Sequence, residues 1–134
     1  MSGLGYVEGL RRFEFSDRQK QIKGRLDVIY ELRTYEAMPG KMQALNQRFA
    51  NITVQYFEKH GLNTVGFWTE RVGTSNTIVY MLAFDDMGHM ERAWNAFRAD
   101  SQRLRLFAET EREGPLVFRI TNRILTPTDY SPLQ

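Results

Sequence analysis

Three side chains that could carry chemistry alternate along residues 28–36, a stretch rich in β-branched and aromatic residues. In an extended strand Glu31, Arg33 and Tyr35 point to the same face, because side chains repeat their direction every second residue. If that face is buried, the guanidinium of Arg33 must pair with the carboxylate of Glu31. Such a pair either is structural, fixing strand register or dimer geometry, or holds the carboxylate or enolate of a ligand.

The candidates for proton transfer, and hence for catalytic residues, are Tyr35 and His60. His60 follows Lys59 at the end of an expected helix, where a cation also suits the exposed carbonyl groups, so helix capping is the competing interpretation. An imidazole at this position could also be an axial ligand of haem. We interpret His89 as a surface residue, and two histidines this far apart in the chain make no metal motif. We therefore expect no metal and no cofactor.

Aromatic and basic residues on later strands complete the candidate ligand-binding set, which is Glu31, Arg33, Tyr35, Trp68, Tyr80 and Arg119. Trp68 and Tyr80 are expected on the two strands of a hairpin, where they either line a pocket or pack in the core or in a dimer interface. Arg119 shares a strand face with Arg123. These charges either guide an anionic ligand or prevent aggregation at the edge of the sheet.

Composition and charge exclude several classes of protein. The 134 residues are 42% hydrophobic and include no cysteine, which fits one domain with a packed core and excludes disulfide frameworks and thiolate sites. Residues 1–27 hold six Lys or Arg and four Asp or Glu, whereas residues 28–134 hold twelve of each. A neutral domain is not expected to bind nucleic acid. The longest apolar run, residues 78–84, is far shorter than the roughly 20 residues of a membrane-spanning helix. We expect a cytoplasmic protein.

The spacing of apolar residues predicts the elements that position these side chains. Residues 28–36 predict a strand that stops before Pro39 and Gly40. An apolar stripe predicts an amphipathic helix that ends at Gly61, and its members are Met42, Leu45, Phe49, Ile52 and Tyr56. Residues 63–72 and 77–84 predict a hairpin. A second helix begins at Asp85 or Asp86, residues 101–111 continue helically, and residues 116–125 predict the last strand.

This order predicts an α+β fold of the ferredoxin-like β-α-β-β-α-β type, a four-stranded antiparallel sheet with both helices on one face. The strand at residues 77–84 is apolar on both sides, as expected for a strand buried on both faces. A second copy of the chain is the simplest cover for the open face, so we expect a homodimer in the form of a dimeric α+β barrel. We assign residues 1–27 to an N-terminal extension or arm, 28–127 to the barrel domain and 128–134 to a C-terminal tail.

Several segments of the chain resemble the NIPSNAP family, a branch of the dimeric α+β barrel superfamily. They are YELRTYEAMPGK at residues 30–41, VGFWTERVG at 65–73, VYMLAFDD at 79–86, ERAWNAFRAD at 91–100 and NRIL at 122–125. The resemblance implies a small homodimer with a cavity between sheet and helices or within the barrel. Barrel relatives include cofactor-free monooxygenases, haem-handling enzymes and lactone isomerases, so the resemblance implies no single reaction.

Three hypotheses about function follow. In the leading one, a homodimeric protein of NIPSNAP type binds a small, largely apolar molecule that carries one polar or anionic group. In the second, the protein is a cofactor-independent oxidoreductase or isomerase in which Tyr35 or His60 handles a proton. In the third, it is a protein interaction module whose residues 1–27 face the partner.

Overall fold

The computed structural model describes residues 27–134, so the expected arm lies outside the described residues except for Asp27. The elements follow one another as β1 (Ile29–Ala37), α3 (Met42–Arg48), the π-helical η1 (Phe49–Thr53), α4 (Val54–Lys59), β2 (Asn63–Thr69), β3 (Thr77–Phe84), α5 (Met87–Ala99), α6 (Ser101–Thr110) and β4 (Val117–Leu125). Within residues 27–134, no helix is long and apolar enough to cross a membrane.

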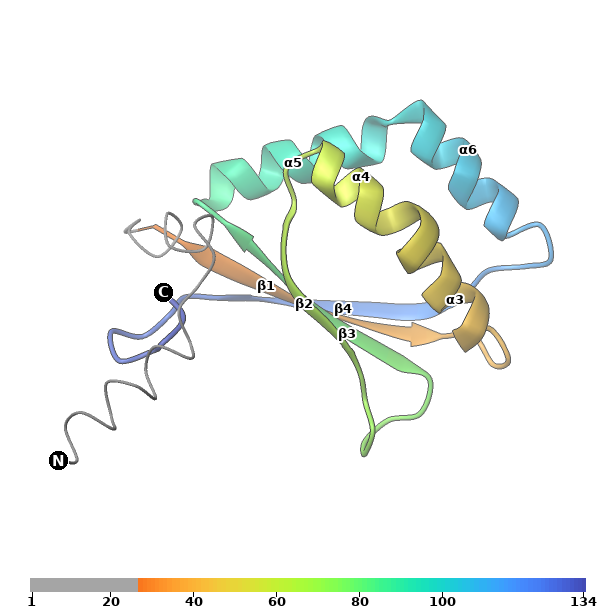
Figure 1. Ribbon diagram of the computed structural model, residues 1–134, viewed down its shortest axis with the longest axis horizontal. Helices are drawn as coiled ribbons and strands as arrows, with labels where there is room; N and C mark the ends of the chain where they lie inside the picture. The colour runs from red at the N-terminus through yellow and green to blue at the C-terminus, as the bar shows by residue number, and fades with distance from the viewer. Residues whose placement is uncertain (1–26) are drawn as a thin grey trace, which may run out of the picture.

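The strands form one antiparallel sheet in the order β2-β3-β1-β4, and the helices lie over one of its faces (Figure 1). This arrangement confirms the predicted ferredoxin-like fold with β1 and β3 in the centre. In the sheet register Arg33 lies opposite Tyr80 on β3 and Asn122 on β4. Residues paired across an antiparallel sheet share a face, so these three side chains point toward the helices.

The first helical segment extends over α3, η1 and α4, as the apolar stripe predicts. Leu45, Phe49 and Tyr56 of that stripe are buried. The regular helix is interrupted by η1, where the backbone N–H of Val54 donates to the carbonyl of Phe49, five residues back. The segment ends at Gly61, which adopts a positive φ of 76° that suits glycine. Periodicity predicts the extent of this helix but not the π-helical turn inside it.

The second helical segment is divided at Asp100, which the sequence pattern does not predict. Asp100 has extended backbone angles, and its Oδ1 accepts the backbone N–H groups of Gln102 and Arg103 at 3.0 and 3.1 Å. Asp100 is therefore the N-cap of α6, and α5 ends just before it. Strand boundaries also differ from expectation. β1 spans Ile29–Ala37 instead of residues 28–36, β2 ends at Thr69 instead of residue 72, and β4 begins at Val117 instead of residue 116.

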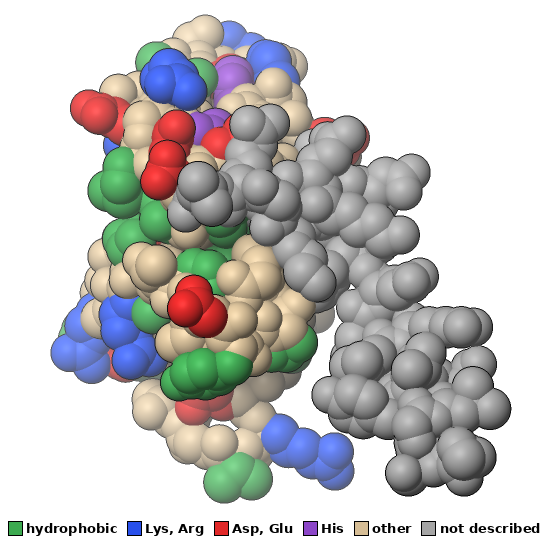
Figure 2. Space-filling model, turned by 90° about the vertical axis from the view of Figure 1, so that its left-hand side faces the viewer, with side chains coloured by type: hydrophobic (Ala, Val, Ile, Leu, Met, Phe, Trp, Pro, Cys, Tyr) green, Lys and Arg blue, Asp and Glu red, His purple; other side chains and the backbone are tan. Residues whose placement is uncertain are grey.

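His89 links two loops and is not merely a surface residue as the sequence suggested. Its Nδ1 accepts the backbone N–H of Asp85 at 2.9 Å, and its Nε2 lies 3.0 Å from the carbonyl oxygen of Gly61. Since a carbonyl can only accept, these partners require the neutral tautomer with the proton on Nε2. The backbone N–H of His89 also donates to the N-cap Asp86 at 2.7 Å. Figure 2 shows histidine and acidic side chains close together in the upper part of the molecule.

The sheet face opposite the helices carries a small apolar cluster of its own. Val28, Tyr30 and Ala83 are buried there, with Leu133 of the C-terminal segment packed against them. The hydroxyl of Tyr30 donates to the backbone carbonyl of Gln134 at 2.6 Å. The last residues thus fold back over one end of this face.

Candidate functional site

The carboxylate of Glu31 is the centre of a buried polar cluster beneath the helices. Its side chain accepts hydrogen bonds from Trp94 Nε1 at 2.7 Å, Arg33 Nη1 at 2.9 Å and Asn122 Nδ2 at 2.8 Å. The Glu31–Arg33 ion pair predicted from the alternation of β1 is therefore present. Glu31 is only 1% exposed. It holds the neighbouring side chains in place instead of facing open space.

Arg33 extends this cluster to two tyrosine hydroxyl groups. Its Nε donates to Tyr80 Oη at 2.9 Å and its Nη2 to Tyr35 Oη at 3.3 Å, while its guanidinium lies over the indole of Trp94 at 4.4 Å. Burial lowers the pKa of Arg33, but its hydroxyl and carboxylate partners raise it by more, to above its usual range. This guanidinium therefore stays charged.

Tyr80 occupies the buried end of the same network. Its side chain is 0% exposed, and its hydroxyl donates to Tyr35 Oη at 3.2 Å. Burial is the main reason why the pKa of Tyr80 is raised well above its ordinary value. The ring of Tyr35 packs against those of Phe49 and Tyr80, with centroid distances of 5.2 and 5.5 Å. Tyr35 is thus held between the buried network and the helices.

A cavity of about 510 Å³ opens where Arg33 and Tyr35 meet the helices. One wall is formed by β1 and β4, and the others are formed by the α3–η1 junction, α5 and α6. Much of its lining is apolar or aromatic; these side chains are Phe49, Trp94, Phe97, Leu104, Phe107, Ala108, Val117 and Ile120. The cavity therefore combines a largely apolar lining with the polar cluster of β1.

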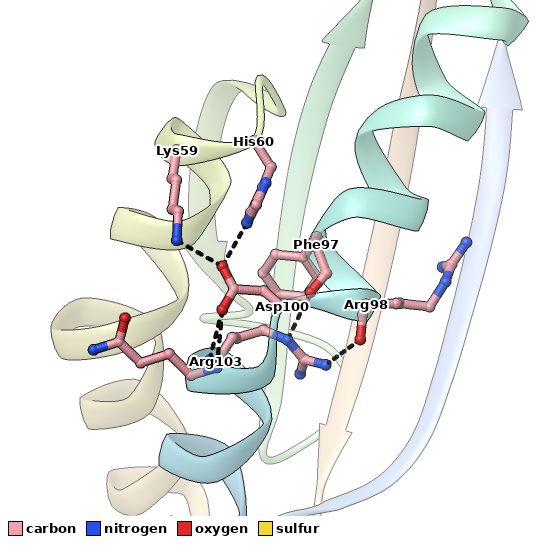
Figure 3. Close-up of polar contacts among 7 residues, drawn as sticks. Lys59, His60, Phe97, Arg98, Asp100 and Arg103 are labelled. Atoms are coloured by element: carbon pink, nitrogen blue, oxygen red, sulfur yellow. Dashed lines mark hydrogen bonds and ion pairs between the residues drawn. The ribbon is translucent and has the colours of Figure 1, made fainter.

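Arginines dominate the charge of the cavity. Among the described residues that line it are four arginines and one carboxylate. The arginines are Arg33, Arg48, Arg98 and Arg103, and the carboxylate is that of Glu111. Figure 3 shows Arg98 and Arg103 extending from the α5–α6 junction.

Arg48 and Arg103 lie against the same ring. The guanidinium carbons of Arg48 and Arg103 are 4.4 and 4.6 Å from the centroid of Phe107. Arg48 Nη1 donates to Glu111 at 3.0 Å, whereas Arg103 donates to the carbonyl oxygens of Phe97 and Arg98 at 2.9 and 3.2 Å. Both arginines are buried, and burial is the main reason why the pKa of Arg103 lies below its usual value. Two buried cations in a lining with one carboxylate favour an anion in the cavity.

His60 belongs to a different cluster, centred on Asp100 (Figure 3). Lys59 Nζ and His60 Nε2 lie 2.9 and 2.8 Å from Asp100 Oδ2. Hydrogen bonds from Lys59, then from His60 and from the backbone of Arg103, hold the pKa of this carboxyl below its usual range. The cluster joins the end of α4 to the junction of α5 and α6, and His60 does not line the cavity. Its catalytic role stays a prediction.

The structure brings together four of the six predicted ligand-binding residues, namely Glu31, Arg33, Tyr35 and Tyr80. Trp68 and Arg119 are not part of this group. Trp68 is paired with Val79 in the sheet register, which places its side chain on the face opposite the helices. There it lies over Gly66 and is 53% exposed. Arg119 also lies on that face and pairs with Glu36 at 3.1 Å.

Sequence reasoning did not select the arginines contributed by the helices. Arg48 directly precedes Phe49 in the apolar stripe, and a cation beside a core position was the available signal. Arg103 follows Asp100 at the spacing of an N-cap contact, so recognising the cap would have indicated that a new helix starts there. Within residues 27–134, no group of three or more His, Cys, Asp or Glu side chains could hold a metal ion.

Comparison with known proteins identifies the family of this chain. The family model described as NIPSNAP matches residues 30–132. The chain belongs to the NIPSNAP family. It is 26% identical over 130 residues to Protein NipSnap homolog 1 of Danio rerio. That match covers 90% of this chain but only 42% of the length of the fish protein.

Solved NIPSNAP structures share the fold. A NIPSNAP family protein with unknown function from Agrobacterium tumefaciens is 26% identical with a TM-score of 0.70, and the match covers 81% of this chain and 95% of that one. Another from the same organism is 25% identical with a TM-score of 0.71, covering 80% and 99%. An uncharacterized NIPSNAP-like domain protein from Burkholderia xenovorans, at 22% identity and a TM-score of 0.70 over 78% and 89%, shows the shared fold alone.

Proposed function

We propose that this NIPSNAP protein is a homodimeric α+β barrel that binds a small, largely apolar molecule carrying one polar or anionic group in the cavity beside Tyr35. The observation that carries the proposal is the lining of that cavity, four arginines and one carboxylate among aromatic and aliphatic side chains. Its volume of about 510 Å³ lies within the range of about 300–1,000 Å³ that is usual for small-molecule sites.

Both parts of the proposed ligand follow from this lining. Apolar groups gain free energy when they leave water for such a surface, at about 25 cal/mol per Å². The arginines supply charged donors, and these bind a carboxylate more strongly than they bind a neutral group. A cation is disfavoured at the same place because Arg48, Arg98 and Arg103 would repel it.

The sheet face opposite the helices supports the homodimer. Figure 1 places the described helices, α3 to α6, on the other side of the sheet. The C-terminal segment covers only the end near Tyr30, while Trp68 is half exposed on this face. A second copy packed there by its own sheet would bury both open faces at once, as expected for an isologous dimer.

Native mass spectrometry of the freshly purified protein tests both parts of the proposal. We expect a dimer with additional non-covalent mass, and the mass of the released compound gives its chemical class. A bare dimer that also binds no member of a panel of apolar carboxylates would contradict ligand binding. A monomer at micromolar concentration would contradict the barrel.

Tyr35 favours a cofactor-independent oxidoreductase or isomerase as the second candidate, because it lines the cavity and carries a hydroxyl that can transfer a proton. The test is to incubate the released compound with the protein in air and to analyse it again. A gain of one oxygen atom indicates oxygenation, and an unchanged mass with a new chromatographic retention time indicates isomerisation. A compound unchanged in both respects argues against catalysis.

A further inference from the structure

The direction of the hydrogen bonds at Tyr80 is fixed by its burial. Its hydroxyl oxygen accepts the Nε–H of Arg33 at 2.9 Å. The side chain is 0% exposed, so its hydroxyl proton cannot go to solvent. Among the described residues, the acceptor within reach of this proton is Tyr35 Oη at 3.2 Å. Since a buried hydroxyl proton requires a partner, Tyr80 donates to Tyr35 and not the reverse.

The hydroxyl oxygen of Tyr35 therefore accepts two hydrogen bonds. One is donated by the hydroxyl of Tyr80, and the other is donated by Arg33 Nη2 at 3.3 Å. A hydroxyl oxygen has two lone pairs and one proton of its own. With both lone pairs occupied, the proton of Tyr35 must point away from Arg33 and Tyr80. The side chain lines the cavity, so this proton is available to a molecule bound there.

Cations line the same cavity as this donor. Arg33 donates to the Tyr35 hydroxyl, while Arg103 and Arg48 pack on Phe107, another residue of the cavity lining. Arg103 uses its Nε and Nη2 for the carbonyl groups at the end of α5. A guanidinium carries five N–H groups, so others remain for a second acceptor. The site thus offers one neutral donor and at least one charged donor.

We propose that the hydroxyl proton of Tyr35 binds one oxygen of a carboxylate ligand while Arg103 attracts the other, so that the cavity selects apolar carboxylates over alcohols and amines of equal size. This inference rests on the proposed function and specifies its ligand class. A carboxylate has two acceptor oxygens and no proton at neutral pH, which matches these donors. An alcohol offers one neutral oxygen in place of two charged ones, and an ammonium group has no acceptor at all.

Octanoate, 1-octanol and octylammonium test this selection, because they share one apolar chain and differ in the polar group. The Trp68→Phe variant serves as the background, since the chain has two tryptophans and Trp94, which lines the cavity, then becomes the single reporter. Quenching of its fluorescence gives the dissociation constants. We expect octanoate to bind at least about tenfold more tightly than 1-octanol, and octylammonium more weakly than both.

Tyr35→Phe removes the proposed donor, and we expect octanoate affinity to fall by about ten- to a hundredfold, the usual loss for a hydrogen bond to a charged group. Tyr130→Phe is the matched control, because it removes a tyrosine hydroxyl at an 87% exposed position that does not line the cavity. Its octanoate affinity should change by less than about threefold. Because Tyr35→Phe also removes the acceptor of the buried Tyr80 hydroxyl, the double variant Tyr35→Phe, Tyr80→Phe is measured as well. If its circular dichroism spectrum matches that of the wild type, a loss of octanoate affinity in this variant reports on binding and not on misfolding.

The outcomes separate this inference from the proposed function. If octanoate binds but the Tyr35→Phe variant binds it equally well, or if 1-octanol binds as tightly, the carboxylate site is wrong while ligand binding stands. If native mass spectrometry shows a bound molecule but octanoate does not bind, the inference alone is overturned. If neither technique detects any binding, both are overturned.

Discussion

Trp94 on α5 donates its indole proton to the carboxylate of Glu31 on β1 across 2.7 Å of buried interior. The same carboxylate accepts from Arg33 of its own strand and from Asn122 on the edge strand β4. One side chain therefore ties a helix to two strands. Arg33 and Trp94 also line the cavity, whereas Glu31 does not, so Glu31 supports two side chains of the cavity wall from below.

Neutralising Glu31 tests this structural role. Glu31→Gln leaves the buried guanidinium of Arg33 without its carboxylate, so we expect a loss of about 2–4 kcal/mol in the free energy of unfolding. Glu36→Gln is the matched control on the same strand, because the Glu36–Arg119 pair is exposed and should contribute less than about 1 kcal/mol. Urea denaturation followed by circular dichroism measures both, and equal losses would argue against the role given to Glu31.

Filling the cavity tests where the ligand binds. Ile120 lines the cavity and is 45% exposed, so Ile120→Trp can occupy the space with little cost to the core. Ile124, on the same face of β4 and 40% exposed, does not line the cavity, which makes Ile124→Trp the control. We expect the first variant to lose the non-covalent mass in native mass spectra and the second to retain it. Retention by both variants would place the ligand elsewhere.

A charge on the open sheet face tests the dimer. Trp68 is half exposed in the single chain, so Trp68→Lys should be tolerated by the monomer but would bury an ammonium group between two packed sheets. We expect this variant to elute as a folded monomer in size-exclusion chromatography with light scattering. Val72→Lys, at a 94% exposed position after β2, should remain dimeric. A Trp68→Lys dimer as tight as the wild type contradicts the proposed interface.

The Asp100 cluster predicts a dependence of stability on pH. The pKa of Asp100 is lower in the folded chain than the usual value of about 3.9, so its stabilising contribution is complete well above that pH. The contribution is lost progressively as the pH falls toward the lowered folded pKa. Asp100→Asn keeps an N-cap residue but removes the charge, so its unfolding free energy should fall less steeply between about pH 5 and pH 2.

Asp129→Asn, at an exposed position in the C-terminal segment, is the control for this measurement. Thermal unfolding across the acid range compares the three proteins. If the Asp100→Asn curve runs parallel to that of the wild type, the ion pairs with Lys59 and His60 contribute nothing to folded stability.

The polar cluster on β1 could be predicted from the sequence because strand geometry is local. Alternation alone places Glu31, Arg33 and Tyr35 on one face, and the central position of β1 then requires the charges to pair. Tyr80, selected from the hairpin as a ligand-binding candidate, lies opposite Arg33 in the register, and its contact with a ligand stays a prediction. Trp68 belongs to the adjacent strand but lies on the other face, so its aromatic character gave no information about the cavity.

The periodicities of two and 3.6 residues, written in the sequence, determined the order of the elements and the ferredoxin-like fold. They repeat within a single element and need no knowledge of its neighbours. The cavity, in contrast, was decided only by tertiary structure. Three of its four arginines come from α3, α5 and α6, beside the π-helical turn at Phe49–Thr53 and the new helix that starts after Asp100. Both features change the direction of side chains relative to the sheet, and packing between distant segments fixes that direction.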